Sequence, residues 1–194
     1  LTACNFFTSD KNALPDSEGD INEVSIIIDD VYWNGDVGDS LRAKLAHSID
    51  GLNKEEPVLK INQFSPKIVN NQINLQRNLV IIQQHDETEF IHVENKYAYP
   101  QNVFYFKGPT IKDLLQLITL HGEILESSIH FYELLKVQED MAASPFNDKR
   151  IQNQYKISLL MPYQYRYALV NDNFLWLKKE LSTGSNSLLI YKVP

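Results

Sequence analysis

Short apolar runs separated by polar turns dominate the chain, and each run of this kind predicts a strand. The first run, residues 21–29, is rich in β-branched residues and lies between acidic turns, and Val31-Tyr32-Trp33 can extend it. Further strands are predicted at 58–64, 78–84, 102–107, 155–161, 166–170 and 187–192, with a partner strand within 85–97. Residues 67–77 fit a short helix or a loop, residues 145–154 a polar loop, and residues 174–181 a strand or a short helix.

Two segments instead repeat their apolar residues at helical spacing. Val37, Leu41, Leu45 and Ile49 step by four, which predicts a short helix that begins at Asp36 or Asp39 and ends before Gly51. A long helix is predicted from Thr110 to about Ala143, where Thr110 and Asp113 have the spacing of a capping box. Its apolar stripe contains Leu114, Leu117, Ile118, Leu125, Tyr132 and Leu135.

The order of these elements predicts the fold class. Several strands follow one another without an intervening helix, which favours an α+β fold over strict βαβ alternation. We expect a largely antiparallel or mixed sheet packed with one short and one long amphipathic helix. Residues 1–20 are interpreted as the end of a lipoprotein signal peptide, a lipidation site and a flexible tether. Residues 21–194 are expected to form a single domain, truncated at its C-terminus because a strand-like run directly precedes Pro194.

The first four residues, Leu1-Thr2-Ala3-Cys4, resemble a bacterial lipobox, and Cys4 is the only cysteine in the chain. In that motif the cysteine sulfur carries a diacylglyceryl group, so Cys4 is predicted as the lipidation site and not as a nucleophile. The longest apolar runs are far too short to cross a bilayer. We therefore expect the chain to be attached to a membrane only through an N-terminal lipid.

Charge and motifs exclude several function classes. The net charge is −7 and no basic cluster occurs, which argues against a nucleic-acid partner. No Gly-x-Ser-x-Gly, Ser-x-x-Lys, P-loop or Gly-x-Gly-x-x-Gly motif is present, so no catalytic residue and no cofactor is predicted. A hydrolase whose site is dispersed along the chain, or completed by a missing C-terminal part, stays open as an alternative.

No metal site is predicted either. The acidic loop at residues 34–40 lacks the alternating carboxylates of a calcium loop, and helix capping accounts better for Asp36, Asp39 and Ser40. His85-Asp86-Glu87 could in principle meet a metal, but solvated turn residues are the better interpretation. His121 and His130 fall on roughly opposite faces of the long helix.

The aromatic residues suggest a binding surface. Tyr163, Tyr165 and Tyr167 would share one face of an extended strand, and Trp33 is a further candidate. An exposed row of rings can stack on sugars, which would make the chain a glycan- or peptidoglycan-binding module. Cross-strand packing within an antiparallel sheet is the favoured interpretation of the same pattern.

Several motifs together resemble a family of Bacteroidota lipoproteins described as domain of unknown function 4837. The resemblance begins at the lipobox and covers nearly the whole chain. Its motifs are Leu14-Pro15-Asp16-Ser17-x-Gly19, Ile21-Asn22-Glu23, Trp33-x-Gly35-x-Val37-Gly38-Asp39-x-x-Arg42, Glu56-Pro57 with Asn62-Gln63, Arg77-Asn78-Leu79, Ala98-Tyr99-Pro100-Gln101 and Phe174-Leu175-Trp176-Leu177-x-x-Glu180.

The resemblance implies a location more than an activity. Members are lipoproteins without an assigned activity and are longer at the C-terminus, so only Cys4 can be carried over, as the lipid site. Surface-exported lipoproteins of that group tend to have acidic residues directly after the cysteine, whereas here residues 5–9 are uncharged. We therefore expect a non-enzymatic binding or interaction domain of the cell envelope, on the periplasmic face of the outer membrane, with an envelope protein or glycan as partner.

Overall fold

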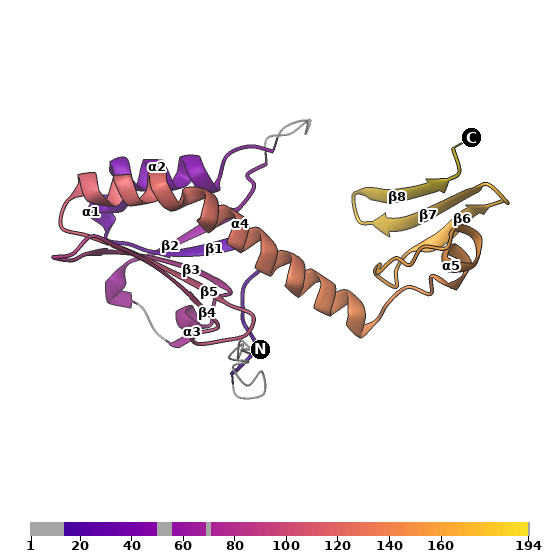
Figure 1. Ribbon diagram of the computed structural model, residues 1–194, viewed down its shortest axis with the longest axis horizontal. Helices are drawn as coiled ribbons and strands as arrows, with labels where there is room; N and C mark the ends of the chain where they lie inside the picture. The colour runs from indigo at the N-terminus through magenta and orange to yellow at the C-terminus, as the bar shows by residue number, and fades with distance from the viewer. Residues whose placement is uncertain (1–13, 50–55, 69–70, 194) are drawn as a thin grey trace, which may run out of the picture. The chain divides into compact units, whose positions relative to one another are not determined.

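The computed structural model describes residues 14–49, 56–68 and 71–193 (Figure 1). The chain divides into two compact units, the first ending at Leu135 and the second beginning at Lys136. The predicted lipidation site Cys4 and the predicted helix-ending Gly51 lie outside the described residues. The expectation of one domain over residues 21–194 stays a prediction.

The first unit contains a five-stranded mixed sheet with the strand order β2-β1-β3-β5-β4. Neighbouring strands run parallel from β2 to β5, and only β4 is antiparallel to its partner β5. In chain order the elements are β1 (Glu23–Ile27), α1 (Asp30–Trp33), α2 (Asp36–Leu45), β2 (Lys60–Phe64), the 3₁₀ turn η1 (Pro66–Ile68), α3 (Asn71–Asn74), β3 (Asn78–Gln84), β4 (Glu89–Glu94), β5 (Asn102–Gly108) and α4 (Ile111–Ala143), which continues into the second unit.

Apolar side chains pack against both faces of this sheet. Helices α2 and α4 lie over one face (Figure 1), where Leu41 and Leu125 belong to the same buried cluster as Ile26 and Phe104. On the opposite face Ile27, Leu79, Ile81 and Val103 pack with Ile73 of α3. The central strands are therefore buried on both sides, which explains why their sequences read as nearly continuous apolar runs.

The second unit contains α5 (Lys149–Tyr155) and a three-stranded antiparallel sheet in the order β6-β7-β8. Its strands are β6 (Arg166–Val170), β7 (Phe174–Leu181) and β8 (Gly184–Tyr191). Ile151 of α5 and Met161 pack against Leu175 and Leu177, which point to one face of the sheet. The core of this unit thus lies on a single side of its sheet.

The α+β fold class is confirmed, with one mixed and one antiparallel sheet and with the predicted short and long helices. The extension of the first strand through Val31–Trp33 was wrong, because the Asp29 side chain accepts a hydrogen bond from Val31 N and caps helix α1. The polar loop predicted at 145–154 contains α5. The strand predicted at 155–161 does not form, because Leu159 N and Ser158 Oγ donate to Asp148 instead of to a neighbouring strand.

Candidate functional site

β1 and β3 are parallel neighbours in the first sheet, and the chain leaves their carboxyl ends in opposite directions. After β1 the chain passes through α1 and α2 and returns at β2, on one side of β1, whereas after β3 it continues to β4 and β5 on the other side. Where two neighbouring parallel strands send their chains in opposite directions, no loop covers the gap between their ends. Ligands of open α/β sheets commonly bind in such a gap.

A crevice of about 500 Å³ occupies this position. Ile27 and Ile81, neighbours in the β1–β3 ladder, line it and are almost fully buried. Val31 of α1 is 76% exposed, so apolar surface extends outward from the crevice. The lining residues are Ile27, Asp29, Val31, Tyr32, Pro66, Ile81, Ile82, Gln83 and Gln84. An apolar floor with a few polar groups at the rim is typical of small-molecule sites.

Polar groups at the rim come from the first turn after β1 and from the end of β3. Asp29 Oδ1 accepts from Val31 N at 3.0 Å, so helix α1 itself holds this carboxylate at the crevice. The Tyr32 hydroxyl donates to Gln84 Oε1 at 3.3 Å and joins the two sides. The described lining contains no Lys, Arg, Ser, Thr, Cys or His. Carboxylate, amide and phenol groups can bind and orient a ligand.

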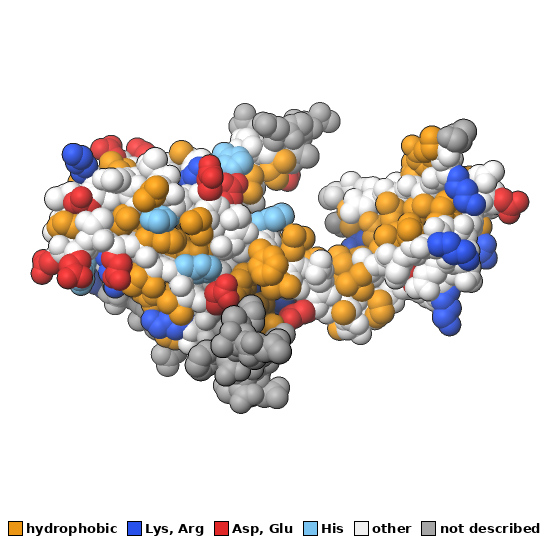
Figure 2. Space-filling model, in the orientation of Figure 1, with side chains coloured by type: hydrophobic (Ala, Val, Ile, Leu, Met, Phe, Trp, Pro, Cys, Tyr) orange, Lys and Arg blue, Asp and Glu red, His pale blue; other side chains and the backbone are white. Residues whose placement is uncertain are grey.

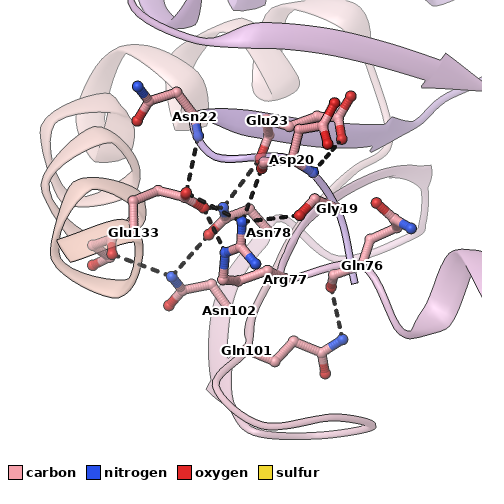
Figure 3. Close-up of polar contacts among 11 residues, drawn as sticks. Gly19, Asp20, Asn22, Glu23, Gln76, Arg77, Asn78, Gln101, Asn102 and Glu133 are labelled. Carbon is pink, nitrogen blue, oxygen red and sulfur yellow. Dashed lines mark hydrogen bonds and ion pairs between the residues drawn. The ribbon is translucent and has the colours of Figure 1, made fainter. Parts of the chain in front are cut away.

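A second polar cluster lies inside the first unit, where Arg77 and Glu133 form a buried ion pair (Figure 3). Arg77 Nε donates to Glu133 Oε1 at 2.8 Å, and Arg77 Nη2 donates to Asp20 O at 2.8 Å. Glu133 also accepts from Asn78 Nδ2 at 2.6 Å and from Asn22 N at 2.9 Å. This cluster joins α4 to the amino ends of β1 and β3. Because its charges are paired, hydrogen-bonded and shielded from solvent, we assign it a structural role.

Amide side chains extend this cluster toward β4. Asn102 Nδ2 donates to Asn78 Oδ1 and to Ser128 O of α4, and the ring of His92 bonds to Asn102 Oδ1 at 2.8 Å. The same ring stacks on Phe104 with centroids 4.3 Å apart. These contacts hold His92 within the packing of the sheet. No group of His, Cys, Asp and Glu in the described part of the chain could hold a metal ion.

The carboxylate of Glu23 lies beside this cluster, at the start of β1. It accepts from Lys60 Nζ at 2.9 Å, Asp20 N at 2.9 Å and Asn62 Nδ2 at 2.5 Å. Burial on its own would raise the pKa of Glu23, but the hydrogen bonds from Lys60, Asp20 and Asn62 outweigh burial and lower that pKa. Glu23 therefore stays ionised and ties β1 to β2.

A lysine and two tyrosines meet on the sheet face opposite α2 and α4. Lys96 Nζ lies 2.6 Å from the hydroxyl of Tyr105 and 4.8 Å from the ring centroids of both Tyr97 and Tyr105. The hydrogen bond to Tyr105 raises the pKa of Lys96. Burial raises the pKa of Tyr105. For Tyr97 burial acts in the same direction, but the hydrogen bonds to Lys96 and Tyr105 and the charge of Lys96 together outweigh it and lower the pKa of Tyr97.

The predicted aromatic residues are distributed over both units. Tyr163 is 53% exposed and lies before β6, Tyr165 and Tyr167 are half-buried against the core of the second unit, and only Tyr167 belongs to the strand. They do not form the predicted row along one strand. Trp33 ends α1 in the first unit, where the guanidinium of Arg42 lies 4.3 Å from its ring.

The predicted acidic loop lies at the start of α2. Asp36 and Asp39 fall in the first turn of α2, where their negative charges interact favourably with the positive end of the helix dipole. The N-cap residue is Gly35, which provides no side-chain hydrogen bond, so the predicted side-chain cap is wrong in this detail. Asp39 Oδ1 instead accepts from Arg42 Nη2 at 2.7 Å.

The fold is that of an α+β protein with an open crevice at the carboxyl ends of parallel strands. The chain belongs to the family described as Domain of unknown function (DUF8532), whose model matches residues 17–142. Residues 144–194 match the Domain of unknown function (DUF4837). The predicted resemblance to the second family is thus confirmed for the last part of the chain, while the motifs between Ser17 and Gln101 lie within the first match. Neither curated proteins nor solved structures gave a match.

Proposed function

We propose that this chain is a lipid-anchored, non-enzymatic binding domain of the bacterial cell envelope, attached through Cys4 to the outer membrane and facing the periplasm. The lipobox-like Leu1-Thr2-Ala3-Cys4 and the match of residues 144–194 to DUF4837 support this proposal. In the described residues no helix is long and apolar enough to cross a bilayer. An anchored domain of this kind acts by holding a partner close to the membrane.

The crevice between β1 and β3 is the proposed binding site, and it is the observation that carries the function. Its position follows from the strand order, its floor is apolar through Ile27 and Ile81, and Asp29 and Gln84 supply polar groups at the rim. About 500 Å³ is enough for a small molecule or for one or two side chains of a peptide.

The charge of the crevice limits which class of ligand can bind there. Asp29 is the only charged residue in the described lining. The nearest cation along the same row of the sheet, Lys107, lies opposite Gln83 in the ladder and is paired with Glu89 at 3.1 Å. A phosphate or carboxylate would meet Asp29 without a cation among the described lining residues, although Lys67 follows the lining residue Pro66 directly. The site therefore favours a neutral or cationic group that carries an apolar body.

Titration with two matched probes tests this site. Phenethylamine is added to ¹⁵N-labelled full-length protein and compared with phenylacetate, which has a similar shape and the opposite charge. We expect amide shifts for residues 27–32 and 81–84 with the amine and weaker shifts with the acid. Gln83→Trp, which places a large ring at the rim, should abolish the shifts, whereas His130→Trp on the exposed side of α4 should keep them. Shifts that are absent or located elsewhere contradict the site.

The anchor is tested separately in cells. Full-length protein with its signal peptide is expressed with an alkyne-labelled fatty acid, and membranes are fractionated. We expect the label on the wild-type chain in the outer-membrane fraction, and neither label nor membrane association for Cys4→Ser. Thr8→Ala, which changes an uncharged residue of the same segment, is the control and should behave as the wild type. Label retained by Cys4→Ser would contradict lipidation at this residue.

A further inference from the structure

Lys96, Tyr97 and Tyr105 bring three hydrogen-bond donors together at one point of the first unit. Lys96 Nζ donates to the hydroxyl oxygen of Tyr105 at 2.6 Å, and the hydroxyl oxygens of Tyr97 and Tyr105 lie 3.5 Å apart. Lys96 is exposed, whereas both tyrosines are half-buried. The ammonium and phenol groups therefore meet at the boundary between the protein and the solvent.

Apolar packing holds the two tyrosine rings in place. Tyr105 belongs to β5, where it lies opposite Ile81 of β3 on one side and Ile91 of β4 on the other. Both rings pack against the buried cluster that contains Ile81. Because the rings are anchored from below, the positions of their hydroxyl groups at the surface are fixed.

The turn between β4 and β5 positions Lys96 and Tyr97. The buried side chain of Gln101 accepts from Tyr97 N at 2.8 Å and donates to Gln76 O at 2.9 Å (Figure 3). Asn95 Oδ1 accepts from Gln101 N at 2.9 Å and closes the same turn. The donors are therefore placed before any ligand arrives, which lowers the entropic cost of binding.

The positive charge of Lys96 is not balanced by a carboxylate of the described residues, because none of their ion pairs includes it. Lys107 lies near the same ring, with Nζ 5.8 Å from the centroid of Tyr105, but it is paired with Glu89 at 3.1 Å. The hydrogen bond to Tyr105 raises the pKa of Lys96, so its ammonium group stays protonated. One positive charge next to two phenol groups remains.

The surroundings do not supply a broad positive field. On the face that Figure 2 shows, the Lys and Arg side chains of the first unit lie scattered among acidic and apolar ones instead of gathering in one patch. The chain as a whole has a net charge of −7 and repels anions. Binding of an anion to this unit would therefore depend on local donors.

We propose that Lys96, Tyr97 and Tyr105 bind an oxyanion, either a phosphate or a carboxylate group of a ligand. The ammonium group has three N–H bonds, one of which is directed to Tyr105, and each phenol can donate its own O–H. The remaining donors can bond to the oxygens of one anion, and hydrogen bonds to a charged acceptor are stronger than neutral ones. None of these three residues lines the crevice between β1 and β3, so the two sites are separate.

The exposure of Lys96 predicts weak binding. Water competes for an exposed cation, so we expect a dissociation constant on the order of 1 mM for an isolated anion. Salt should weaken this binding further by screening the charge. A larger ligand that also contacts the surrounding surface would bind more tightly.

Titration of the ¹⁵N-labelled full chain with inorganic phosphate, at constant pH and ionic strength, tests this site. We expect saturable amide shifts for residues 95–97 and 104–106. Sodium chloride replaces phosphate in the reference titration and should not produce them. Acetate is the second probe, and its response relative to phosphate distinguishes a carboxylate from a phosphate ligand. Binding of either probe at these residues supports the proposal.

Three variants assign the donors. Lys96→Gln removes the charge and should weaken phosphate binding by roughly tenfold, and Tyr105→Phe, which keeps the ring, should weaken it by a few-fold. Lys112→Gln, at an exposed lysine of α4, removes the same charge elsewhere in the first unit and should leave binding unchanged. The amide spectrum shows that each variant is folded.

Several results would overturn the proposal. Wild-type protein might show no shifts with either probe, or the same shifts with chloride, and both results exclude a specific anion site. Equal weakening by Lys96→Gln and Lys112→Gln would assign the effect to overall charge. Shifts confined to residues 27–32 and 81–84 would place the anion at the crevice instead.

Discussion

Arg77 and Glu133 form an ion pair across the first unit, with Nε and Oε1 2.8 Å apart and both side chains 3% exposed. Arg77 begins the turn into β3, and Glu133 lies on α4, 56 positions later in the chain. Two further backbone contacts, from Arg77 to Gly19 O and Asp20 O, bring the segment before β1 into the same cluster. One buried pair therefore connects three segments that are far apart in the sequence.

Glu133→Ala should strongly destabilise the first unit. The change leaves the guanidinium of Arg77 buried without its counter-ion, and breaking one partner of a buried pair costs about 3–5 kcal/mol. Urea unfolding measures the loss. Glu123→Ala, at an exposed position of the same helix, is the control and should change the free energy of unfolding by less than about 0.5 kcal/mol.

The double variant Arg77→Met/Glu133→Leu separates the charge from the packing. Because it removes both charges and keeps the volume, it should recover part of the stability lost in Glu133→Ala. A double variant that is less stable than the single variant would show that the remaining contacts of Asn78 and Asn22 dominate the cluster.

We expect the substitution of glycine by alanine to have opposite effects on stability at two positions, Gly38 and Gly122. A Cβ on Gly38 would lie 1.9 Å from Trp33 O, a backbone atom that also accepts from Arg42. A Cβ on Gly122 would lie 2.4 Å from Cε of Lys44, the far end of a flexible side chain. Only the second obstacle can move aside.

Gly38→Ala should therefore destabilise the protein by about 1–3 kcal/mol, because the backbone of α1 has to shift away from α2. Gly122→Ala should be neutral or stabilising by up to about 1 kcal/mol, since alanine favours the helical state over glycine. Thermal unfolding of both variants next to the wild type measures the difference. Equal losses would contradict the argument from backbone contact.

Local sequence patterns predicted the elements of this fold better than their pairing. The apolar stripe of α4 and the nearly continuous apolar runs of β3 and β5 are found at the predicted positions. The parallel order β2-β1-β3-β5 could not be read from the same runs, because strand pairing depends on contacts between distant segments. The crevice was missed for this reason, since it exists only where β1 and β3 diverge.

The buried ion pair was also missed, although the sequence holds one signal for it. Leu125, Ile129 and Glu133 are spaced by four, so the carboxylate occupies a position on the buried face of α4. A charged residue in such a stripe requires a partner. The identity of that partner, Arg77, is not a local property and follows only from the fold.

Thr110→Ala should shorten or fray the start of α4. The hydroxyl of Thr110 accepts from Asp113 N at 3.3 Å and donates to the carboxylate of Asp113 at 2.5 Å, which is the predicted capping pair. Loss of such a cap costs about 1 kcal/mol. Urea unfolding checks the value, and Thr110→Ser, which keeps the hydroxyl, should retain most of the stability. A loss of the same size in Thr110→Ser would point to the methyl group instead.

Acid should destabilise the second unit through Asp148. Hydrogen bonds from Leu159 N, from Gln152 and from Ser158 lower the pKa of Asp148, so its contribution to stability is present above the pKa of a free aspartate and is lost as the pH falls through the lowered value. Asp148→Asn should reduce stability at neutral pH and flatten this acid dependence, because the amide can replace only part of the acceptor set. The fluorescence of Trp176 in a Trp33→Phe background measures unfolding of this unit. Asp172→Asn, at an exposed aspartate of the same unit, should keep the wild-type pH dependence, and an unchanged acid transition in Asp148→Asn would remove Asp148 as its cause.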